Sequence, residues 1–196
     1  MRLLSSKHGS QSKPRSKTGS QIVELAVVLP LFLVFAVATF DFGHVFTVRD
    51  KLANSAREGA RQGAGQSFQD LVTGPGPTGA PSTDITAVAQ SVYNYLLDTN
   101  VLATNGKNCV LNAGANVGAF AWQYSATNCP DTLTIKIERA DAQVVNGGTA
   151  ILTRVTVNYP AHFFLFHQVI GLIAQGANFS STYQLSAVGT MPNVRN

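Results

Sequence analysis

The longest apolar segment lies near the N-terminus and continues, without a turn signal, into an amphipathic helical pattern. Residues Leu25–Phe40 carry no charge. Extended to about residues 22–45, the segment reaches the roughly 20 residues that a helix needs to cross a hydrocarbon core about 30 Å thick. Apolar residues then recur every three or four positions as far as Ala60, which is the spacing of one helix face. We therefore predict one helix over residues 20–63, with a transmembrane span in its first half.

A second helical pattern follows a segment rich in glycine and proline. That segment, residues 64–82, is a linker by composition. Ser82 is predicted to cap the second helix, whose apolar face runs from Ile85 to Leu97. The linker also contains a literal G-x-G-x-x-G match, but its prolines lack the N–H groups that a phosphate site needs, so no nucleotide site is predicted there.

Beyond the second helix the pattern changes to alternation, which is typical of half-buried strands. Residues 133–138 and 151–159 alternate, and a turn at Asn146-Gly147-Gly148 separates them, so we predict an antiparallel pair. Shorter strand candidates are residues 109–111, 120–124 and 180–188. The fold class is therefore predicted as α+β, in which a long N-terminal transmembrane and amphipathic helix precedes a small head, residues 83–196, with an antiparallel sheet and one or two short helices.

A second apolar stretch, residues 162–170, lies between the last two predicted strands. It is too short to cross a bilayer. We expect it to cover the sheet as a loop or short helix. The alternative is an exposed stretch that contacts the membrane surface or another subunit.

Positive charge is concentrated before the apolar segment. The chain has 196 residues and a net charge of +4, but five bases and no acids lie in residues 1–19. The remaining nine bases and ten acids leave the rest of the chain at −1. The basic character therefore belongs to a leader, residues 1–19, and gives no reason to expect a nucleic-acid partner.

Three processing routes fit this leader. An ordinary signal peptide would be cut near Ala38 and release a soluble protein. An uncleaved signal anchor would leave the chain at full length and attached to the membrane. A type IV prepilin leader would be cut after Gly19, leaving Ser20 as the first residue. Gly19 followed five residues later by Glu24 resembles the prepilin-peptidase motif, and we favour this third route.

Glu24 is an unusual residue for the edge of a membrane helix. An acid at the centre of a span costs about 2.5–3.5 kcal/mol on insertion scales. Glu24 therefore either extends to the headgroup level or finds a partner. In pilin-like proteins that partner is the free N-terminal amine of a neighbouring subunit, so the prepilin reading gives Glu24 a role in assembly.

The first third of the chain resembles the TadE-like family. The residues that carry the resemblance come in the family's order: Val23-Glu24-Leu25, then Pro30 in the apolar helix, then Asp41-Phe42-Gly43, then Ala56-Arg57-Glu58-Gly59-Ala60-Arg61. Two positions depart from the family pattern, because Leu25 stands where phenylalanine is usual and His44 where arginine is frequent. The match is strong over about residues 19–64.

The resemblance implies a minor pilin or pseudopilin of tight-adherence (Flp, type IVc) pilus assembly, or of a related secretion system. The implied partners are a prepilin peptidase, other pilin-like subunits, the inner-membrane assembly platform and membrane lipid. The implied location is the inner membrane, crossed once, with a cytoplasmic N-terminus and an exported head that would be extracellular in a pilus. Five bases precede the span and four follow it closely. Because these numbers nearly balance, the positive-inside rule does not decide the orientation, which is inferred from the leader instead.

The Ala56–Arg61 block has two interpretations. Its charged residues, Arg57, Glu58 and Arg61, have the spacing of a solvated helix face. The other interpretation is an interaction surface for the head or a partner subunit. Gly59 supports close packing, since a glycine inside a helix costs up to about 1 kcal/mol relative to alanine.

Cys109 and Cys129 both follow the membrane segment. If that side is exported, a disulfide between them is expected, and the alternative is two buried free thiols. Closing this loop would contribute roughly 3 kcal/mol.

No enzymatic chemistry is apparent in the sequence. It contains no nucleophile elbow, P-loop or zinc-protease motif. His162 and His167 are five residues apart, which is a poor spacing for metal ligands on a helix. We expect a non-enzymatic protein without metal or cofactor. The rival class is an exported binding or enzymatic domain that an anchor merely tethers.

Overall fold

The fold is described by a computed structural model over residues 18–66, 78–102, 109–145, 148–163, 165, 168–169 and 181–193. Within these residues, two helices precede six strands. Their bounds are α1 (Thr18–Ala64), α3 (Thr83–Asp98), β1 (Val110–Leu111), β2 (Ala115–Gly118), β3 (Ala121–Thr127), β4 (Thr134–Val145), β5 (Gly148–His162) and β6 (Thr182–Pro192). The predicted α+β class is confirmed. Most of the predicted leader and residues 67–77 of the predicted linker lie outside the described residues.

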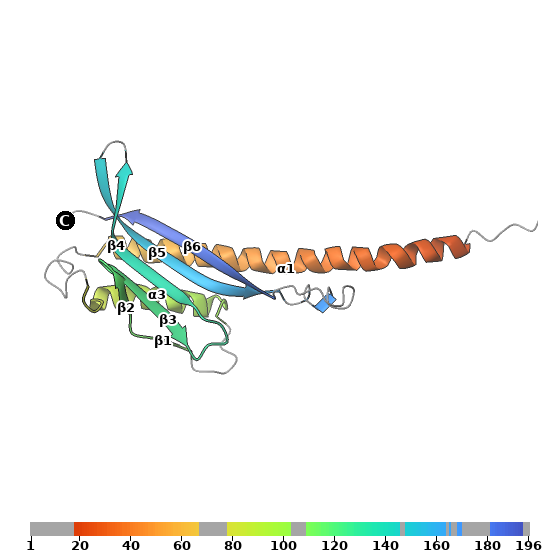
Figure 1. Cartoon of the computed structure of the whole chain (residues 1–196), viewed down its shortest axis with the longest axis horizontal. Coiled ribbons are helices and arrows are strands. Elements are labelled where there is room, and N and C mark those ends of the chain that lie inside the picture. The colour runs from red at the N-terminus through yellow and green to blue at the C-terminus, as the bar shows by residue number, and fades with distance from the viewer. Residues whose placement is uncertain are drawn as a thin grey trace, which may run out of the picture.

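Helix α1 is one uninterrupted helix of 47 residues, about 70 Å long at 1.5 Å per residue. Figure 1 shows the head beside its C-terminal half, while its N-terminal half extends away from the head. No break separates the two halves, because the apolar run passes directly into the amphipathic pattern without a glycine pair or a turn.

The six strands form one antiparallel sheet in the order β1-β3-β4-β5-β6, and β2 pairs with β3. The four strands β3 to β6 follow one another in sequence and in space, which is the simplest antiparallel arrangement. The register places Ile135 opposite Val157, and Val157 opposite Ala187. Side chains of alternate residues therefore gather on one face of the sheet.

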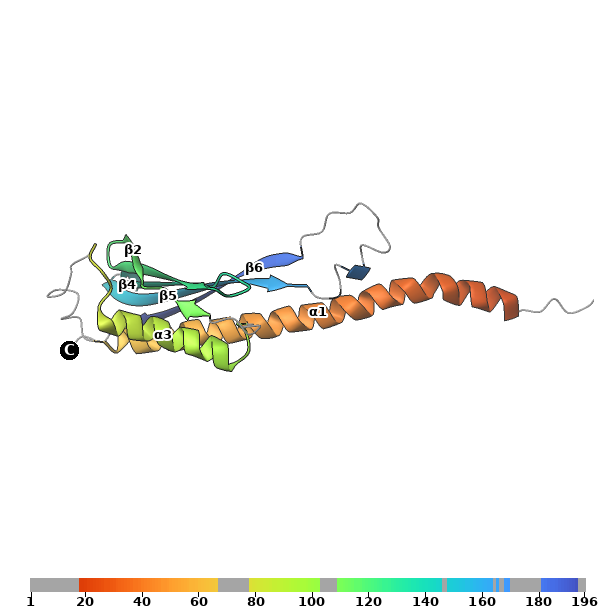
Figure 2. The ribbon, with the colours of Figure 1, turned by 90° about the horizontal axis from the view of Figure 1, so that it is seen from below.

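Both helices cover that face, so the head has two layers (Figure 2). Helix α1 packs against β5 and β6, and α3 packs against α1 and β4. Ser82 caps α3 as predicted, since its hydroxyl accepts a hydrogen bond from the Ile85 N–H. The largest fully buried hydrophobic side chains come from both helices, from β3 and β4, and from Leu133 just before β4: Trp122, Tyr124, Leu52, Ile85, Leu96, Leu133, Ile135 and Ile137.

The second half of α1 is part of this core. Leu52, Ala56 and Ala60 are fully buried, and Val45 and Val48 are nearly so. These residues are the predicted amphipathic face of the helix. The packed body of the head therefore includes α1 from about Asp41 onwards, and not only the residues after the linker.

Several local predictions differ from the structure. Ile151 shares the alternation of the buried β5 residues, yet it is 42% exposed. The reason is its position, because the tips of β4 and β5 project beyond the sheet as a hairpin (Figure 1). Strand β2 was not predicted. Of the apolar stretch 162–170, Phe163 packs against the core and Leu165 is exposed, whereas residues 164, 166–167 and 170 lie outside the described part.

Candidate functional site

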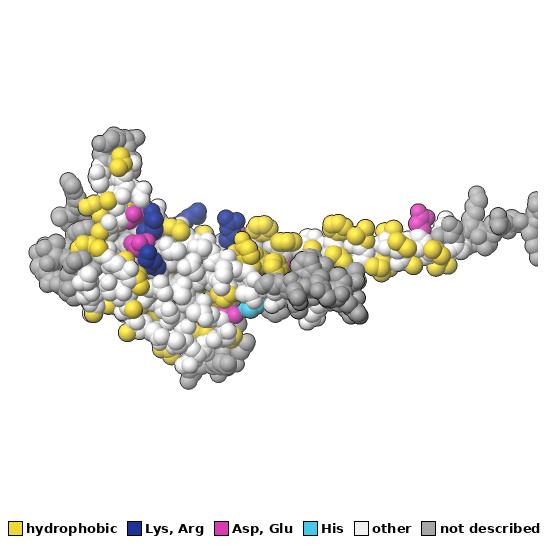
Figure 3. Space-filling view, viewed as in Figure 1, with side chains coloured by type: hydrophobic (Ala, Val, Ile, Leu, Met, Phe, Trp, Pro, Cys, Tyr) yellow, Lys and Arg dark blue, Asp and Glu magenta, His cyan; other side chains and the backbone are white. Residues whose placement is uncertain are grey.

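The N-terminal half of α1 is an apolar helix that no described residue of the head buries. Its large surface side chains between Ile22 and Phe40 are 45–75% exposed. By length and composition it is a helix that could cross a membrane. Hydrophobic side chains cover the extended half of the helix in Figure 3. Since exposed apolar surface of this extent is costly in water, the helix suits single-pass membrane anchoring.

The predicted processing and assembly residues lie at the start of this helix. Gly19 and Ser20 are within the first turn of α1, so the helix already includes the predicted cleavage point. Glu24 is exposed, and Val23, Val27 and Val28 lie beside it on the open surface of the helix. No residue in the described part of the chain pairs with Glu24.

Pro30 lies inside α1 without breaking it. A proline lacks the N–H for one intrahelical hydrogen bond, and its ring crowds the preceding turn. Figure 2 shows α1 curving in the half that extends from the head. Pro30 lies in that half, and a helix interruption of this kind is a common cause of a bend.

Asp41 marks the point where the head first contacts the helix. It is only 5% exposed, and its Oδ2 atom accepts a hydrogen bond of 3.0 Å from the Leu165 N–H. The next residue, Phe42, packs edge-to-face on Phe163 with ring centroids 5.8 Å apart. Asp41 and Phe42 therefore fasten the chain after β5 to the helix. Gly43, by contrast, has open space where a Cβ would lie.

The small residues of the Ala56–Arg61 block face the head. Ala56 and Ala60 are fully buried. A Cβ on Gly59 would lie 2.5 Å from the Val92 side chain of α3. The block thus lets α1 approach both α3 and the sheet closely, which supports the interpretation of an interaction surface for the head.

The charged residues of the same block face solvent. Arg57 is exposed, and Arg61 forms an ion pair of 2.6 Å with Glu58. The hydrogen bond from Arg61 holds the pKa of the Glu58 carboxyl below its usual value. Exposed pairs of this kind contribute little to stability. The two interpretations of the block therefore describe its two faces.

The sequence reasoning missed two residues that fix α1 to the sheet. A Cβ on Gly189 of β6 would lie 2.2 Å from the Ala56 carbonyl oxygen of α1, so strand and helix backbones touch there. Arg139 is 1% exposed and donates from Nη2 to the Gln66 carbonyl just after α1, at 3.1 Å. The sequence contained a sign of each residue's role. A glycine inside a strand suggests close backbone approach, and Arg139 continues the alternation of buried residues in β4.

A cluster of polar side chains lies at the end of the sheet near His44 and Val48. Asp131, between β3 and β4, accepts hydrogen bonds from Tyr159 at 3.1 Å and pairs with the His162 ring. The other ring nitrogen of His162 lies 3.3 Å from the Thr182 hydroxyl. Burial and the nearby Asp131 carboxylate raise the pKa of the Tyr159 hydroxyl, so it stays a donor. The cluster joins β5, β6 and the β3–β4 connection.

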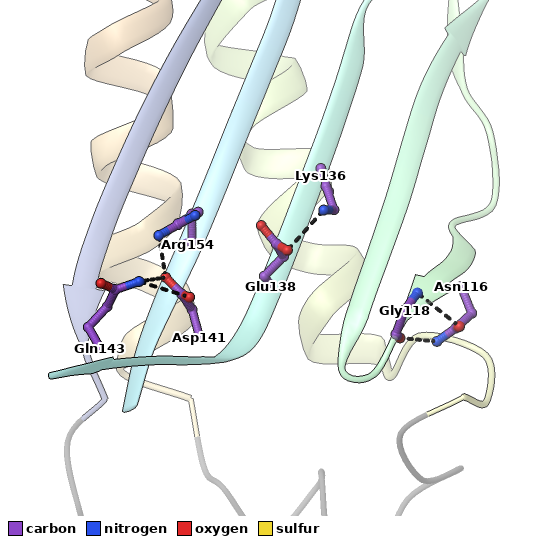
Figure 4. Close-up of polar contacts among 7 residues, drawn as sticks. All are labelled: Asn116, Gly118, Lys136, Glu138, Asp141, Gln143 and Arg154. Carbon is purple, nitrogen blue, oxygen red and sulfur yellow. Dashed lines mark hydrogen bonds and ion pairs between the residues drawn. The ribbon is translucent and has the colours of Figure 1, made fainter. Parts of the chain in front are cut away.

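The other face of the sheet carries charge and hydrogen bonds close to the projecting hairpin (Figure 4). Arg154 forms an ion pair of 2.6 Å with Asp141, and Gln143 also donates to Asp141. Lys136 pairs with Glu138 at 2.9 Å. These contacts lie where the β4–β5 register shifts between Glu138 and Asp141, so they hold the base of the hairpin.

The structure joins Cys109 and Cys129 in a disulfide, with Cα atoms 4.9 Å apart. This separation is within the normal range for the bond. The Cys109 carbonyl also accepts a hydrogen bond of 2.7 Å from the Tyr93 hydroxyl of α3. The segment between the two cysteines includes β1, β2 and β3. The bond would therefore link the residue before β1 to a residue just after β3, at one edge of the sheet.

We expect alkylation in denaturant without reductant to leave the mass of the purified chain unchanged, because both sulfurs are bonded. Reduction should then lower the unfolding free energy by about 3 kcal/mol, the value for a loop of this size. Mass spectrometry and denaturant melts measure the two effects. The Cys109→Ser and Cys129→Ser double variant is the control, since reductant should not change its stability. Two alkylated cysteines before reduction would contradict the bond.

Metal ligation has no candidate among the residues that the structure describes, since no three His, Cys, Asp or Glu side chains there are close enough to hold an ion. An open cavity of about 580 Å³ lies between α1 and the start of β6. It lies beside the Asp41 contact, at the end of the head nearest the apolar half of α1.

Comparison with known proteins gives a match to a protein family. No curated protein and no solved structure matches the chain significantly. The family model described as TadE-like protein matches residues 19–61, which is nearly the whole of α1 and excludes the strands. The resemblance seen in the sequence is confirmed over this segment: the N-terminal helix of the chain, from Gly19 to Arg61, is similar to that of TadE-like proteins.

Proposed function

We propose that the chain is a non-enzymatic, membrane-anchored minor pilin or pseudopilin that acts in assembly of a tight-adherence (Flp, type IVc) pilus or a related secretion system. The TadE-like match supports involvement in a Tad-type pilus system. The proposal of a pilin-like subunit rests on one observation, the exposed N-terminal half of α1. It is apolar and exposed, and among the described residues none from the head buries it and none pairs with its one carboxylate.

The proposed mechanism has two stages. In the membrane, lipid covers the apolar half of α1. During assembly, neighbouring helices replace that lipid, and the Glu24 carboxylate pairs with the N-terminal amine that cleavage after Gly19 exposes on an adjacent subunit. Such a pair satisfies both charges in an apolar surrounding, where an unpaired charge is costly.

The partners follow from these stages. A prepilin peptidase would remove the leader on the cytoplasmic side, and the inner-membrane platform and other pilin-like subunits would receive the cleaved helix. The head would be exported. Its rigid attachment to α1, through Asp41, Gly189 and the buried alanines, would fix its position relative to the membrane.

The experiment compares the native chain with Glu24→Ala in cells that assemble these pili. We expect N-terminal sequencing to find Ser20 first in both proteins, and equal amounts of both in the membrane. Pilus number should fall by roughly a hundredfold or more in Glu24→Ala, because removing one partner of a buried ion pair leaves the other charge unpaired at a cost of about 3–5 kcal/mol, and each 1.4 kcal/mol is a factor of about ten.

Thr39→Ala is the matched control. Thr39 is a polar residue at the other end of the same span, and its hydroxyl donates only within the helix, to the Phe35 carbonyl. It should leave pilus number unchanged. A mature chain that starts near Thr39 would make the protein a secreted one and overturn the proposal, and so would normal assembly by Glu24→Ala.

A further inference from the structure

The cavity between α1 and β6 lies where the head meets the level of the lipid headgroups. The 20 residues Gln21–Phe40 span about 30 Å as a helix, which equals the thickness of a hydrocarbon core. Asp41, the next residue, is already buried by the head. The head therefore begins where the hydrocarbon ends, and the cavity opens directly beyond that boundary.

The lining of the cavity combines aromatic rings with one cation. Phe42, Phe46 and Phe163 contribute the rings, and Arg49 contributes the guanidinium, from α1. Tyr183 and Ser186 of β6 add hydroxyl groups. Phe42, Phe46 and Tyr183 are each at least half exposed. Aromatic side chains of this kind are enriched at membrane–water interfaces, where part of the ring contacts apolar chains.

Arg49 is the charge that selects the occupant. It is exposed, and no carboxylate in the described part of the chain pairs with it. It follows Phe40 by nine positions, about 13 Å along the axis. Side chains on a helix lean toward its N-terminus, so the guanidinium leans back toward the membrane. A guanidinium also forms paired hydrogen bonds with phosphate oxygens.

We propose that this cavity binds the headgroup of an anionic phospholipid from the membrane that α1 spans. Arg49 contacts the phosphate, the hydroxyl-bearing residues of β6 contact the polar headgroup, and the phenylalanine rings contact the upper part of the acyl chains. The inference rests on the membrane anchoring in the proposed function. It adds a specific lipid contact that holds the head against the bilayer surface.

The test uses the full chain in nanodiscs that contain equal amounts of phosphatidylglycerol and phosphatidylcholine. After gentle transfer to detergent, native mass spectrometry counts the lipids that stay bound. We expect phosphatidylglycerol to be retained in preference to phosphatidylcholine. Arg49→Gln should reduce that preference by about fivefold, since one basic residue near an anionic membrane surface contributes roughly this factor.

Arg57→Gln is the matched control. It makes the same charge change on an exposed residue of the same helix, eight positions further from the membrane, and Arg57 does not line the cavity. It should retain the native preference. Equal retention of the two lipids by the native chain, or equal losses in the two variants, would overturn the inference.

Two further readouts separate the possible failures. Replacing chloride by inorganic phosphate at constant ionic strength should leave lipid retention unchanged, and displacement of the lipid would show that the site takes free phosphate instead. Co-purification of the chain with the nanodisc reports anchoring. A chain that stays outside the disc contradicts the proposed function, whereas an inserted chain without lipid preference contradicts only the lipid site.

Discussion

A fragment that begins at residue 65 is expected not to fold, whereas a fragment that begins at Asp41 is expected to fold cooperatively. The shorter fragment keeps α3 and every strand. It loses the α1 face that covers β5 and β6, including Leu52 and Val48, which are buried. Burying each large apolar side chain contributes about 1.5–3 kcal/mol, and the alanines and the uncovered strand residues add to the loss. The sum is comparable to the whole stability of a typical domain, about 5–15 kcal/mol.

The measurement is thermal unfolding followed by circular dichroism, with both fragments made in an oxidising compartment and kept in the same mild detergent. The fragment from Asp41 serves as the control, since it has the same disulfide and the complete core. A cooperative transition of the shorter fragment at the temperature of the longer one would show that α1 is only a tether. That outcome would also remove the basis for a head fixed rigidly to the membrane helix.

Gly189→Ala is expected to destabilise the full chain by about 2 kcal/mol or more. The added Cβ would lie 2.2 Å from the Ala56 carbonyl oxygen and 2.4 Å from its carbon. Both are backbone atoms of a buried helix turn, so neither can rotate away, and β6 and α1 must separate. Overpacking of this kind costs about 1–3 kcal/mol and sometimes more. For a chain of this size the melting temperature should fall by roughly 4–8 °C.

Gly118→Ala is the control for the loss of a strand glycine. Its new Cβ would meet only the Ala121 side chain at 3.6 Å, which is an ordinary contact. We expect its melting temperature to stay close to that of the native chain. If the two variants melted alike, the contact between β6 and α1 would be looser than the structure has it.

The head and the apolar half of α1 are expected to move as one rigid unit. The helix that would lie in the membrane and the helix that supports the sheet are the same element, and small residues bring its backbone against β6 and α3. A displacement of the apolar half, by lipid or by a neighbouring subunit, would therefore move the head with it. This coupling suits a subunit whose helix packs with others while its head is exported.

Local sequence patterns determined the elements of this protein. The apolar run without a charge and the three- and four-residue spacing after it predicted one long helix, since helical geometry places those residues on one side. Alternation predicted β4, β5 and β6, and Ser82 predicted the start of α3. The TadE-like resemblance rested on residues close together in the sequence, such as Glu24, Pro30 and the Ala56–Arg61 block, and the family match covers that same segment.

Only the tertiary structure decided how these elements meet. The amphipathic pattern of α1 shows that one face is buried but does not say by what. Its partners, β5 and β6, are about a hundred or more residues away in the chain. Three features depend on that arrangement: the close approach at Gly189, the hydrogen bond that the Leu165 N–H donates to Asp41, and the exposure of Ile151 in a projecting hairpin. Periodicity reports which side of an element is buried, whereas contacts between distant segments are set by packing of the whole chain.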